Sequence, residues 1–191
     1  MADIDSKFLQ GNDRLQQLGH FFVYSIENII KYKKQMPSLP DNDFYRMKNG
    51  RDIFNLSLIT DKILEYKYKT VFRRFVPKKP MYISHGIALL FDDKGLIPHL
   101  TAQDFKNKSP LKIIPTLPSH PSDLIDKLFI NPVNFIVNTR SINDEMKYML
   151  LTYGLRNLGA HDLEKHDVFV SKYDNIIKWL LFSIFSAIKA L

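Results

Sequence analysis

The chain has 191 residues and a formal net charge of +7, and its apolar fraction of 45% and charged fraction of 25% are those of an ordinary folded protein. These values exclude wholesale disorder, and the length fits one domain or a domain with a helical appendage. The absence of cysteine excludes disulfides, thiolate zinc sites and a cysteine nucleophile, and it fits a reducing cytoplasm. The excess of basic residues favours polyanionic partners, either nucleic acid or an anionic membrane surface.

Two features argue against a membrane protein. The N-terminal M-A-D-I-D-S-K is acidic and polar, unlike a secretory signal. The longest apolar run, residues 179 to 188, is shorter than the ~20 residues that span a bilayer. We therefore expect a cytoplasmic protein without membrane association.

The first part of the chain predicts two long helices. Apolar residues recur at helical spacing over residues 8 to 35, where Gly11 and Gly19 weaken or bend the helix, and again from about residue 53 to 75. The turn cluster M-P-S-L-P-D-N-D at 36 to 43 ends the first helix, and V-P-K-K-P at 76 to 80 ends the second.

The middle of the chain predicts one short element and a long loop. The stretch M-Y-I-S-H-G-I-A-L-L-F, residues 81 to 91, favours a short helix, with a strand as the alternative because so short an apolar run has no decisive period. The D-D-K-G turn at 92 to 95 stops it. Residues 96 to 121 carry five prolines and predict an extended loop or lid.

Helical patterns resume in the last part of the chain. Residues 122 to 130 predict a helix, Pro132 interrupts it, and Ser141 or Asn143 opens the next helix, which runs through Leu155.

The final helix is expected to begin at S-K-Y-D, a capping box formed by Ser171 and Asp174, and to run to Leu191. Together the patterns give five to seven helices and at most a marginal strand. The predicted fold class is all-α.

Several common sites are absent from the sequence. No glycine-rich phosphate-binding loop and no H-E-x-x-H motif occur. His161 and His166 are five residues apart, which places them on different faces of a continuous helix. We therefore expect neither a metal nor a cofactor.

Basic runs interleaved with tyrosines give candidate RNA-binding residues. Such faces can follow a phosphate backbone and stack bases. The alternative is a solvated surface in which cations near helix C-termini complement the helix dipole. The candidates are Lys31, Lys33, Lys34, Arg73, Arg74, Lys78 and Lys79.

The stretch Y-G-L-R-N-L-G-A-H-D, residues 153 to 162, carries the candidate catalytic residues Arg156, Asn157 and His161. A guanidinium can hold an anionic phosphate bidentately, and an imidazole that titrates near neutrality can take a proton from a ribose 2′-hydroxyl. The 2′-oxygen would then attack the adjacent phosphorus and leave a 2′,3′-cyclic phosphate, with no metal required. Asn157 could orient the histidine or donate to a phosphate oxygen.

The chain contains a second arginine and histidine at similar spacing, Arg14 and His20, within a predicted helix that separates their side chains. The stretch at 153 to 162 differs because Asn157 follows its arginine and because Gly159 can end the helix and let the histidine swing back. The structural alternatives are an ion pair at the rim of the core for the arginine and a helix cap for the histidine.

The sequence L-R-N-L-G-A-H resembles the motif of the HEPN superfamily, the higher eukaryote and prokaryote nucleotide-binding domains, which is an arginine, a polar residue, a few variable residues and a histidine. Arg156, Asn157 and His161 match its three positions. The resemblance marks residues 121 to 191 as a HEPN-like core. It leaves 1 to 120 as an N-terminal helical part with the proline-rich loop. We expect the two parts to form one compact unit.

The resemblance implies a small helical bundle that cleaves single-stranded RNA without a metal, in a prokaryotic defence or toxin–antitoxin system. It further implies a homodimer with a composite active site, in which the apolar helix from Tyr173 to Leu191 has a second role as dimer surface. An antitoxin or a defence-system protein would be a further partner. The alternatives are a catalytically silent HEPN-like module that binds a nucleotide, RNA or protein, and a purely structural helical adaptor.

Overall fold

The computed structural model describes residues 13–35, 43–106, 111, 136–137, 140–141, 144–158 and 172–191. Within these residues the fold is all-α, as predicted. Its elements are α2 (Asp13–Gln35), α3 (Asp43–Phe75), α4 (Ile83–Asp93), the 3-10 helix η2 (Asp104–Lys106), β1 (Ile136–Val137), β2 (Arg140–Ser141), α6 (Asp144–Leu158) and α8 (Tyr173–Lys189).

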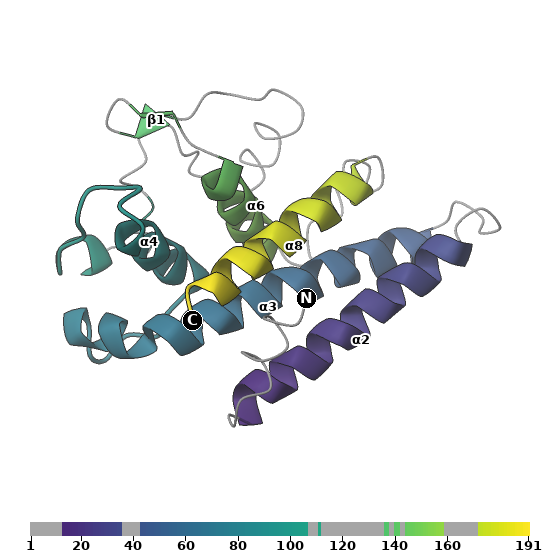
Figure 1. The fold of residues 1–191 in the computed structure, drawn as a ribbon, viewed down its shortest axis with the longest axis horizontal. Helices are drawn as coiled ribbons and strands as arrows, with labels where there is room; N and C mark the ends of the chain where they lie inside the picture. Colours follow the sequence, from purple (N-terminus) through teal and green to yellow (C-terminus); the bar gives the residue numbers. More distant parts are fainter. Residues whose placement is uncertain are drawn as a thin grey trace.

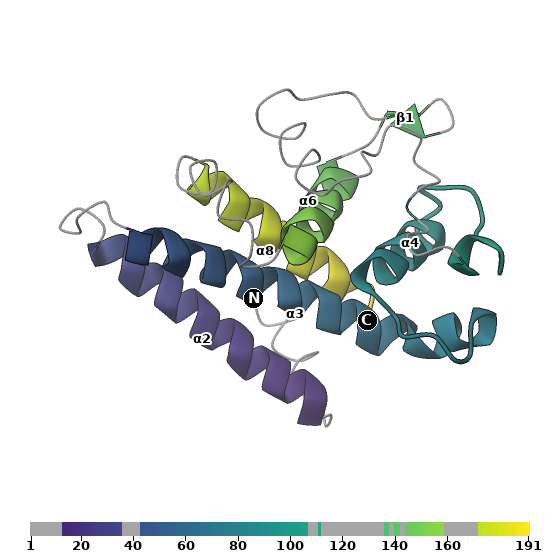
Figure 2. The same ribbon diagram turned by 180° about the vertical axis from the view of Figure 1, so that it is seen from behind.

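The long helix α3 is the centre of the fold. It packs against α2, α4, α6 and α8, and α6 packs in turn against α4 and α8. In Figures 1 and 2, α2 lies along one side of α3, and α4, α6 and α8 gather on the other. All five of the described α-helices contribute to one hydrophobic core, so residues from both 1–120 and 121–191 share it.

The first two predicted helices are present with different starts. In α2, the described helix runs from Asp13 without a break at Gly19, and residues 8 to 12 lie outside the described part. In α3, the helix begins at Asp43, well before the expected residue 53. Among the described side chains of these early turns, the Lys48 amine lies 4.0 Å from the centroid of the Tyr32 ring of α2.

The stretch at 81 to 91 forms a helix, α4, which decides between the two readings of that segment. Its lack of period has a plain cause, because every residue from Ile83 to Phe91 is buried. Gly86 lets α4 approach α3 closely, since a Cβ at that position would lie 2.8 Å from the Leu64 Cβ. The helix ends as the D-D-K-G turn predicted. Gly95 takes a φ of 62°, and the Leu96 amide donates to the Phe91 carbonyl.

The described part of the predicted proline-rich loop contains the short helix η2. Most of the rest of that loop lies outside the described residues. The predicted helix at 122 to 130 and Pro132 lie outside them as well. The marginal strand occurs elsewhere than considered: β1 and β2 pair antiparallel, Ile136 with Ser141. Of the two predicted starts for α6, Ser141 is therefore wrong, because it lies in β2.

The ends of α8 differ slightly from the prediction. The N-cap residue is Lys172, without a side-chain cap hydrogen bond, and the helix ends at Lys189 rather than Leu191. Ser171 lies outside the described residues, so its part in the predicted capping box stays a prediction. The Asp174 carboxylate forms an ion pair with Lys33 of α2, with a separation of 2.6 Å, a tertiary contact that the local pattern did not predict.

Candidate functional site

Arg156 lies in the last turn of α6 and points at α3. Its Nε donates to Asp61 Oδ2 over 3.2 Å, and its guanidinium carbon lies 4.9 Å from the centroid of the Phe54 ring. Phe54 and Asp61 are two helical turns apart on α3, so they share a face of that helix. The ion pair at the core rim that was the structural alternative for Arg156 is thus present.

The geometry leaves part of the arginine fork open. Within the described part of the chain the hydrogen bond to Asp61 uses Nε alone, so the two terminal nitrogens remain available to an anion. The Arg156 side chain is 30% exposed, against 15% for Asp61. The carboxylate is therefore the buried anchor of the pair, and the guanidinium is its solvent-facing end.

Burial has the largest effect on the pKa of Asp61. Removal of the carboxyl from water raises the pKa of Asp61 above its usual value of 3.8, and the neighbouring Arg156 opposes that shift without cancelling it. The pair is consequently weak evidence for stability. Its clearer physical effect is to hold a planar guanidinium in one orientation.

The other two predicted catalytic residues have different outcomes. Asn157 is exposed, but its amide nitrogen donates to the Tyr153 carbonyl of its own helix over 2.8 Å. His161 and Gly159, on which the predicted return of the histidine depends, lie outside the described residues. Arg156 and Asn157 are therefore adjacent at the end of α6, and their geometry relative to the histidine stays a prediction.

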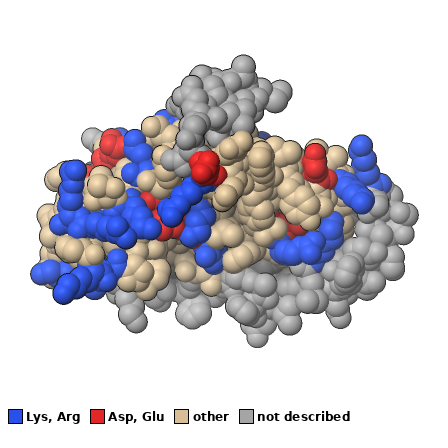
Figure 3. All heavy atoms as spheres, turned by 90° about the horizontal axis from the view of Figure 1, so that it is seen from below, with Lys and Arg blue, Asp and Glu red and all other residues tan. Residues whose placement is uncertain are grey.

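The seven predicted RNA-binding residues fall into two groups that do not meet. Lys31, Lys33 and Lys34 are at the C-terminal end of α2, near the start of α3, whereas the other four are at and beyond the opposite end of α3. A helix of 33 residues is about 50 Å long. Figure 3 shows Lys and Arg side chains gathered at the left end of this face, with further basic side chains toward its right end and mostly uncharged surface between them.

The individual contacts favour neither reading of these basic residues outright. Lys33, Lys34, Arg73 and Arg74 all lie in last turns, as the helix-dipole alternative requires. Lys33 is paired with Asp174, and the Lys79 amine donates to the Lys106 carbonyl over 2.9 Å. Four exposed basic residues lie at the C-terminal end of α3 and just beyond it, and we call them the basic surface: Arg73, Arg74, Lys78 and Lys79.

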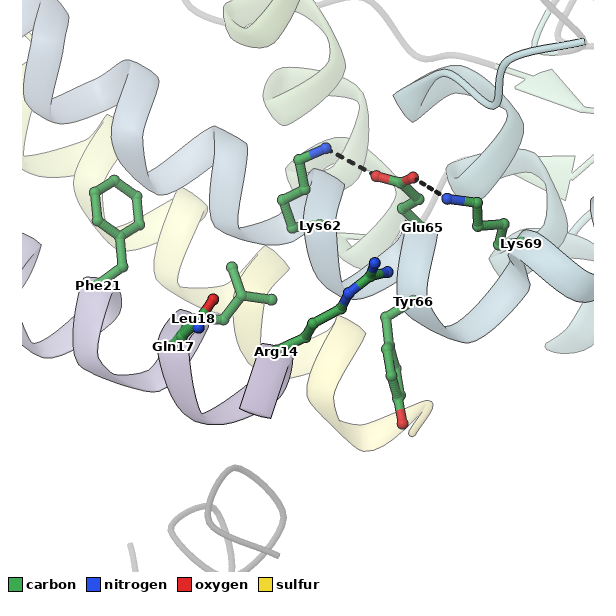
Figure 4. Close-up of a pocket in the computed structure, with 8 residues that line it drawn as sticks. All are labelled: Arg14, Gln17, Leu18, Phe21, Lys62, Glu65, Tyr66 and Lys69. Carbon is green, nitrogen blue, oxygen red and sulfur yellow. Dashed lines mark hydrogen bonds and ion pairs between the residues drawn. The ribbon is translucent and has the colours of Figure 1, made fainter. Parts of the chain in front are cut away.

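Sequence reasoning missed a pocket of about 450 Å³ between α2 and α3. Arg14, the arginine of the second arginine–histidine pair, reaches into it from α2, and Lys62, Glu65 and Lys69 line it from α3 (Figure 4). The spacing of residues 62, 66 and 69 on one helical face was the available signal. That spacing alone does not predict a pocket, because Arg14 comes from a different helix and no sequence pattern links it to these residues.

A smaller groove of about 270 Å³ lies on the outer face of α8 and is lined mostly by apolar side chains. Phe182 is 44% exposed there, and its ring stacks on Tyr148 of α6 with centroids 5.1 Å apart. Most of the remaining apolar side chains of α8 face the core. The helix therefore has a buried face and a partly apolar outer face.

Two further findings concern metals and membranes. Among the described residues, no group of three or more His, Asp or Glu side chains is arranged to hold a metal ion. Nor does any described helix combine the length and apolar character needed to cross a bilayer.

Comparison with protein-family models, with curated proteins and with solved structures finds no match to this chain.

Proposed function

We propose that the protein is a metal-independent endoribonuclease of the HEPN type that cleaves single-stranded RNA in the cytoplasm, as part of a prokaryotic defence or toxin–antitoxin system. The observation that carries the proposal is Arg156: a partly exposed guanidinium anchored through Nε by a mostly buried carboxylate, with no hydrogen bond from its terminal nitrogens to the described residues. The residues that follow it in the chain supply the rest of the R-N-x3-H motif, Asn157 and His161.

In the proposed reaction Arg156 holds two oxygens of the scissile phosphate and stabilises the charge that grows on them. His161 accepts the proton of the ribose 2′-hydroxyl while the 2′-oxygen bonds to phosphorus. The bond from phosphorus to the 5′-oxygen breaks, and that oxygen takes up a proton. The products are a 2′,3′-cyclic phosphate and a 5′-hydroxyl.

Asp61 acts in this proposal as a positioning residue and touches no substrate. Its hydrogen bond to Nε fixes the plane of the guanidinium, while the Phe54 ring supports one face of it. Asn157 donates one amide hydrogen to the Tyr153 carbonyl, and its second amide hydrogen can be donated to a phosphate oxygen.

A homodimer with a composite site is part of the same proposal. The partly exposed apolar face of α8 around Phe182 supports it, because a second copy could cover that face. Chemical crosslinking and light scattering of wild type beside Phe182→Asp test this element separately from catalysis.

The catalytic proposal is tested with purified protein and a labelled single-stranded RNA in EDTA. We expect cleavage products that end in a 2′,3′-cyclic phosphate, and we expect Arg156→Ala and His161→Ala to form them far more slowly. His20→Ala is the matched control, because His20 is an exposed histidine on α2 away from the motif. RNA left intact by wild type would refute the proposal.

A catalytically silent RNA-binding module is the second candidate. The observation that favours it is that Arg156 and Asn157 both already have intramolecular hydrogen bonds. On this account wild type retains RNA without cleaving it, and induced expression of wild type and of His161→Ala gives the same host growth. Growth arrest by wild type that the variant loses would exclude it.

A further inference from the structure

The pocket between α2 and α3 concentrates positive charge from two helices. Arg14 on α2 and both Lys62 and Lys69 on α3 line it, with Glu65 as its only acidic lining residue among the described ones. The excess is therefore two positive charges. In Figure 4 the Arg14 side chain extends from α2 toward the α3 residues, so the three cations converge from two directions on one hollow.

Glu65 holds the two lysines in place. The Lys62 amine donates to one carboxylate oxygen over 2.8 Å, and the Lys69 amine donates to the other over 2.9 Å. These hydrogen bonds, that of Lys62 first, lower the pKa of Glu65 below its usual value of 4.5. Each ammonium has three donors, so one bond to Glu65 leaves donors for an anion.

The pocket also offers an aromatic ring. Tyr66 lies between the two lysines in sequence, lines the same pocket and is 43% exposed. An exposed ring beside cations is the arrangement with which proteins stack a base and hold its phosphate. The volume of about 450 Å³ lies in the range of small-ligand pockets.

The pocket begins within one helical turn, along α3, of the carboxylate that anchors Arg156. Asp61, the partner of Arg156, directly precedes Lys62 and lies one helical turn before Glu65 on α3. Residues 61, 65 and 69 thus follow one row of the helix over about 12 Å. Beyond Lys69, the same helical face continues to the exposed Arg73 of the basic surface.

We propose that this pocket binds a phosphorylated nucleotide, with Arg14, Lys62 and Lys69 on the phosphate and Tyr66 against the base. Resting on the proposed function, the ligand is a nucleotide of the single-stranded RNA whose scissile phosphate lies at Arg156. A free nucleotide carries the same chemistry, and the experiment separates the two sources.

The test is fluorescence anisotropy with a labelled 2′-O-methyl oligouridylate, which lacks the 2′-hydroxyl and is not cleaved. Lys69→Gln should weaken binding about fivefold at about 0.1 M salt and reduce the slope of log K against log salt by about 0.7, the loss of one phosphate contact. Lys69→Arg should restore both. Lys178→Gln, at an exposed lysine of α8, is the matched control and should bind as wild type.

Further substitutions test the stacking of Tyr66 on the nucleobase and the effect of the Glu65 carboxylate. Tyr66→Ala should weaken binding about fivefold or more, whereas Tyr66→Phe keeps the ring and the affinity. Glu65→Gln should tighten binding, because it removes the one opposing charge from the pocket; damage to the fold cannot produce that direction. Circular dichroism and the melting temperature of each variant establish that it is folded.

Competition with unlabelled ADP identifies the source of the nucleotide. ADP that fails to displace the oligonucleotide, with pocket variants that bind it weakly, assigns the pocket to the RNA strand. Displacement by ADP that Lys69→Gln and Tyr66→Ala both diminish assigns it to a free nucleotide. Lys69→Gln and Tyr66→Ala variants that bind both ligands as the Lys178→Gln control does would overturn the proposal.

Failure of this inference and failure of the proposed function give different results. If wild type leaves natural RNA intact but binds the uncleavable strand through the pocket, the catalytic proposal fails and the pocket stands. If RNA is cleaved and the pocket variants bind and cleave normally, only the pocket proposal fails.

Discussion

Two neighbouring carboxylates of α3 differ in what they do with their cations. Asp61 is mostly buried, pairs with one arginine and has a raised pKa. Glu65, one turn later, is more exposed, pairs with two lysines and has a lowered pKa. Burial has the larger effect on the pKa of Asp61, whereas charge-assisted hydrogen bonds have the larger effect on the pKa of Glu65.

The difference indicates a division of labour along one helix. A buried carboxylate that gains little stability from its arginine is suited to fix an orientation, as a reacting group requires. A partly exposed carboxylate between two lysines leaves them able to attract and hold an anion. The first arrangement fits the end of α6 as a reaction site, and the second fits the pocket as a binding site.

The largest expected effect is the loss of Arg156. Arg156→Ala should lower the cleavage rate about 10²- to 10³-fold, because a positioned donor to the developing phosphate charge is lost. Arg156→Lys keeps the charge without the planar fork and should recover little of the rate. Single-turnover cleavage measures both, and an Arg156→Lys rate equal to wild type would contradict the fixed-fork account.

Asp61→Asn comes next and separates position from stability. It should lower kcat about 10- to 100-fold through a misplaced guanidinium. It should leave the unfolding free energy at neutral pH within about 1 kcal/mol, because the buried charge gains little from its partner. Cleavage kinetics and urea unfolding of the same preparation measure the two effects. A large loss of unfolding free energy would make Asp61 a purely structural residue.

Glu65→Gln is the matched change one turn away. It should cost about 0.2 to 1 kcal/mol of stability, as expected for exposed ion pairs, with no loss of kcat. Urea unfolding at low and high salt measures the cost, which should shrink as salt screens the pairs. A loss of kcat like that of Asp61→Asn would erase the distinction between the two carboxylates.

The smallest effect is the opposite pH dependence of the two groups. The folded-state pKa of Asp61 is raised, so its contribution to stability is greatest below pH 3.8 and falls as pH rises through the folded pKa. The folded-state pKa of Glu65 is lowered, so its contribution is present above pH 4.5 and is lost as pH falls through the folded pKa.

Urea unfolding from about pH 3 to about pH 7 measures these contributions as differences between wild type and each neutral variant. The difference for Asp61→Asn should fall with rising pH, and the difference for Glu65→Gln should rise. If both differences in unfolding free energy rose with pH, burial would not be the main influence on the pKa of Asp61.

The sequence predicted those elements whose local pattern and tertiary role agree. The apolar period of α2 and of the second half of α3 is the stripe that each buries, so both helices were predictable. The extension of α3 back to Asp43 was not predicted, and Lys48 in that extension contacts Tyr32 of another helix. The partner of Asp174 was not predicted either, because Lys33 comes from a different helix.

By itself, the sequence determined the all-α class, the end of α4 at Gly95 and the place of Arg156 and Asn157 near a helix end. These depend on contacts between residues close in the chain. Only the tertiary structure decided that Asp61 anchors Arg156, and that Arg14 shares a pocket with Lys62 and Lys69. Those partners come from different helices, and no local periodicity records which faces the common core brings together.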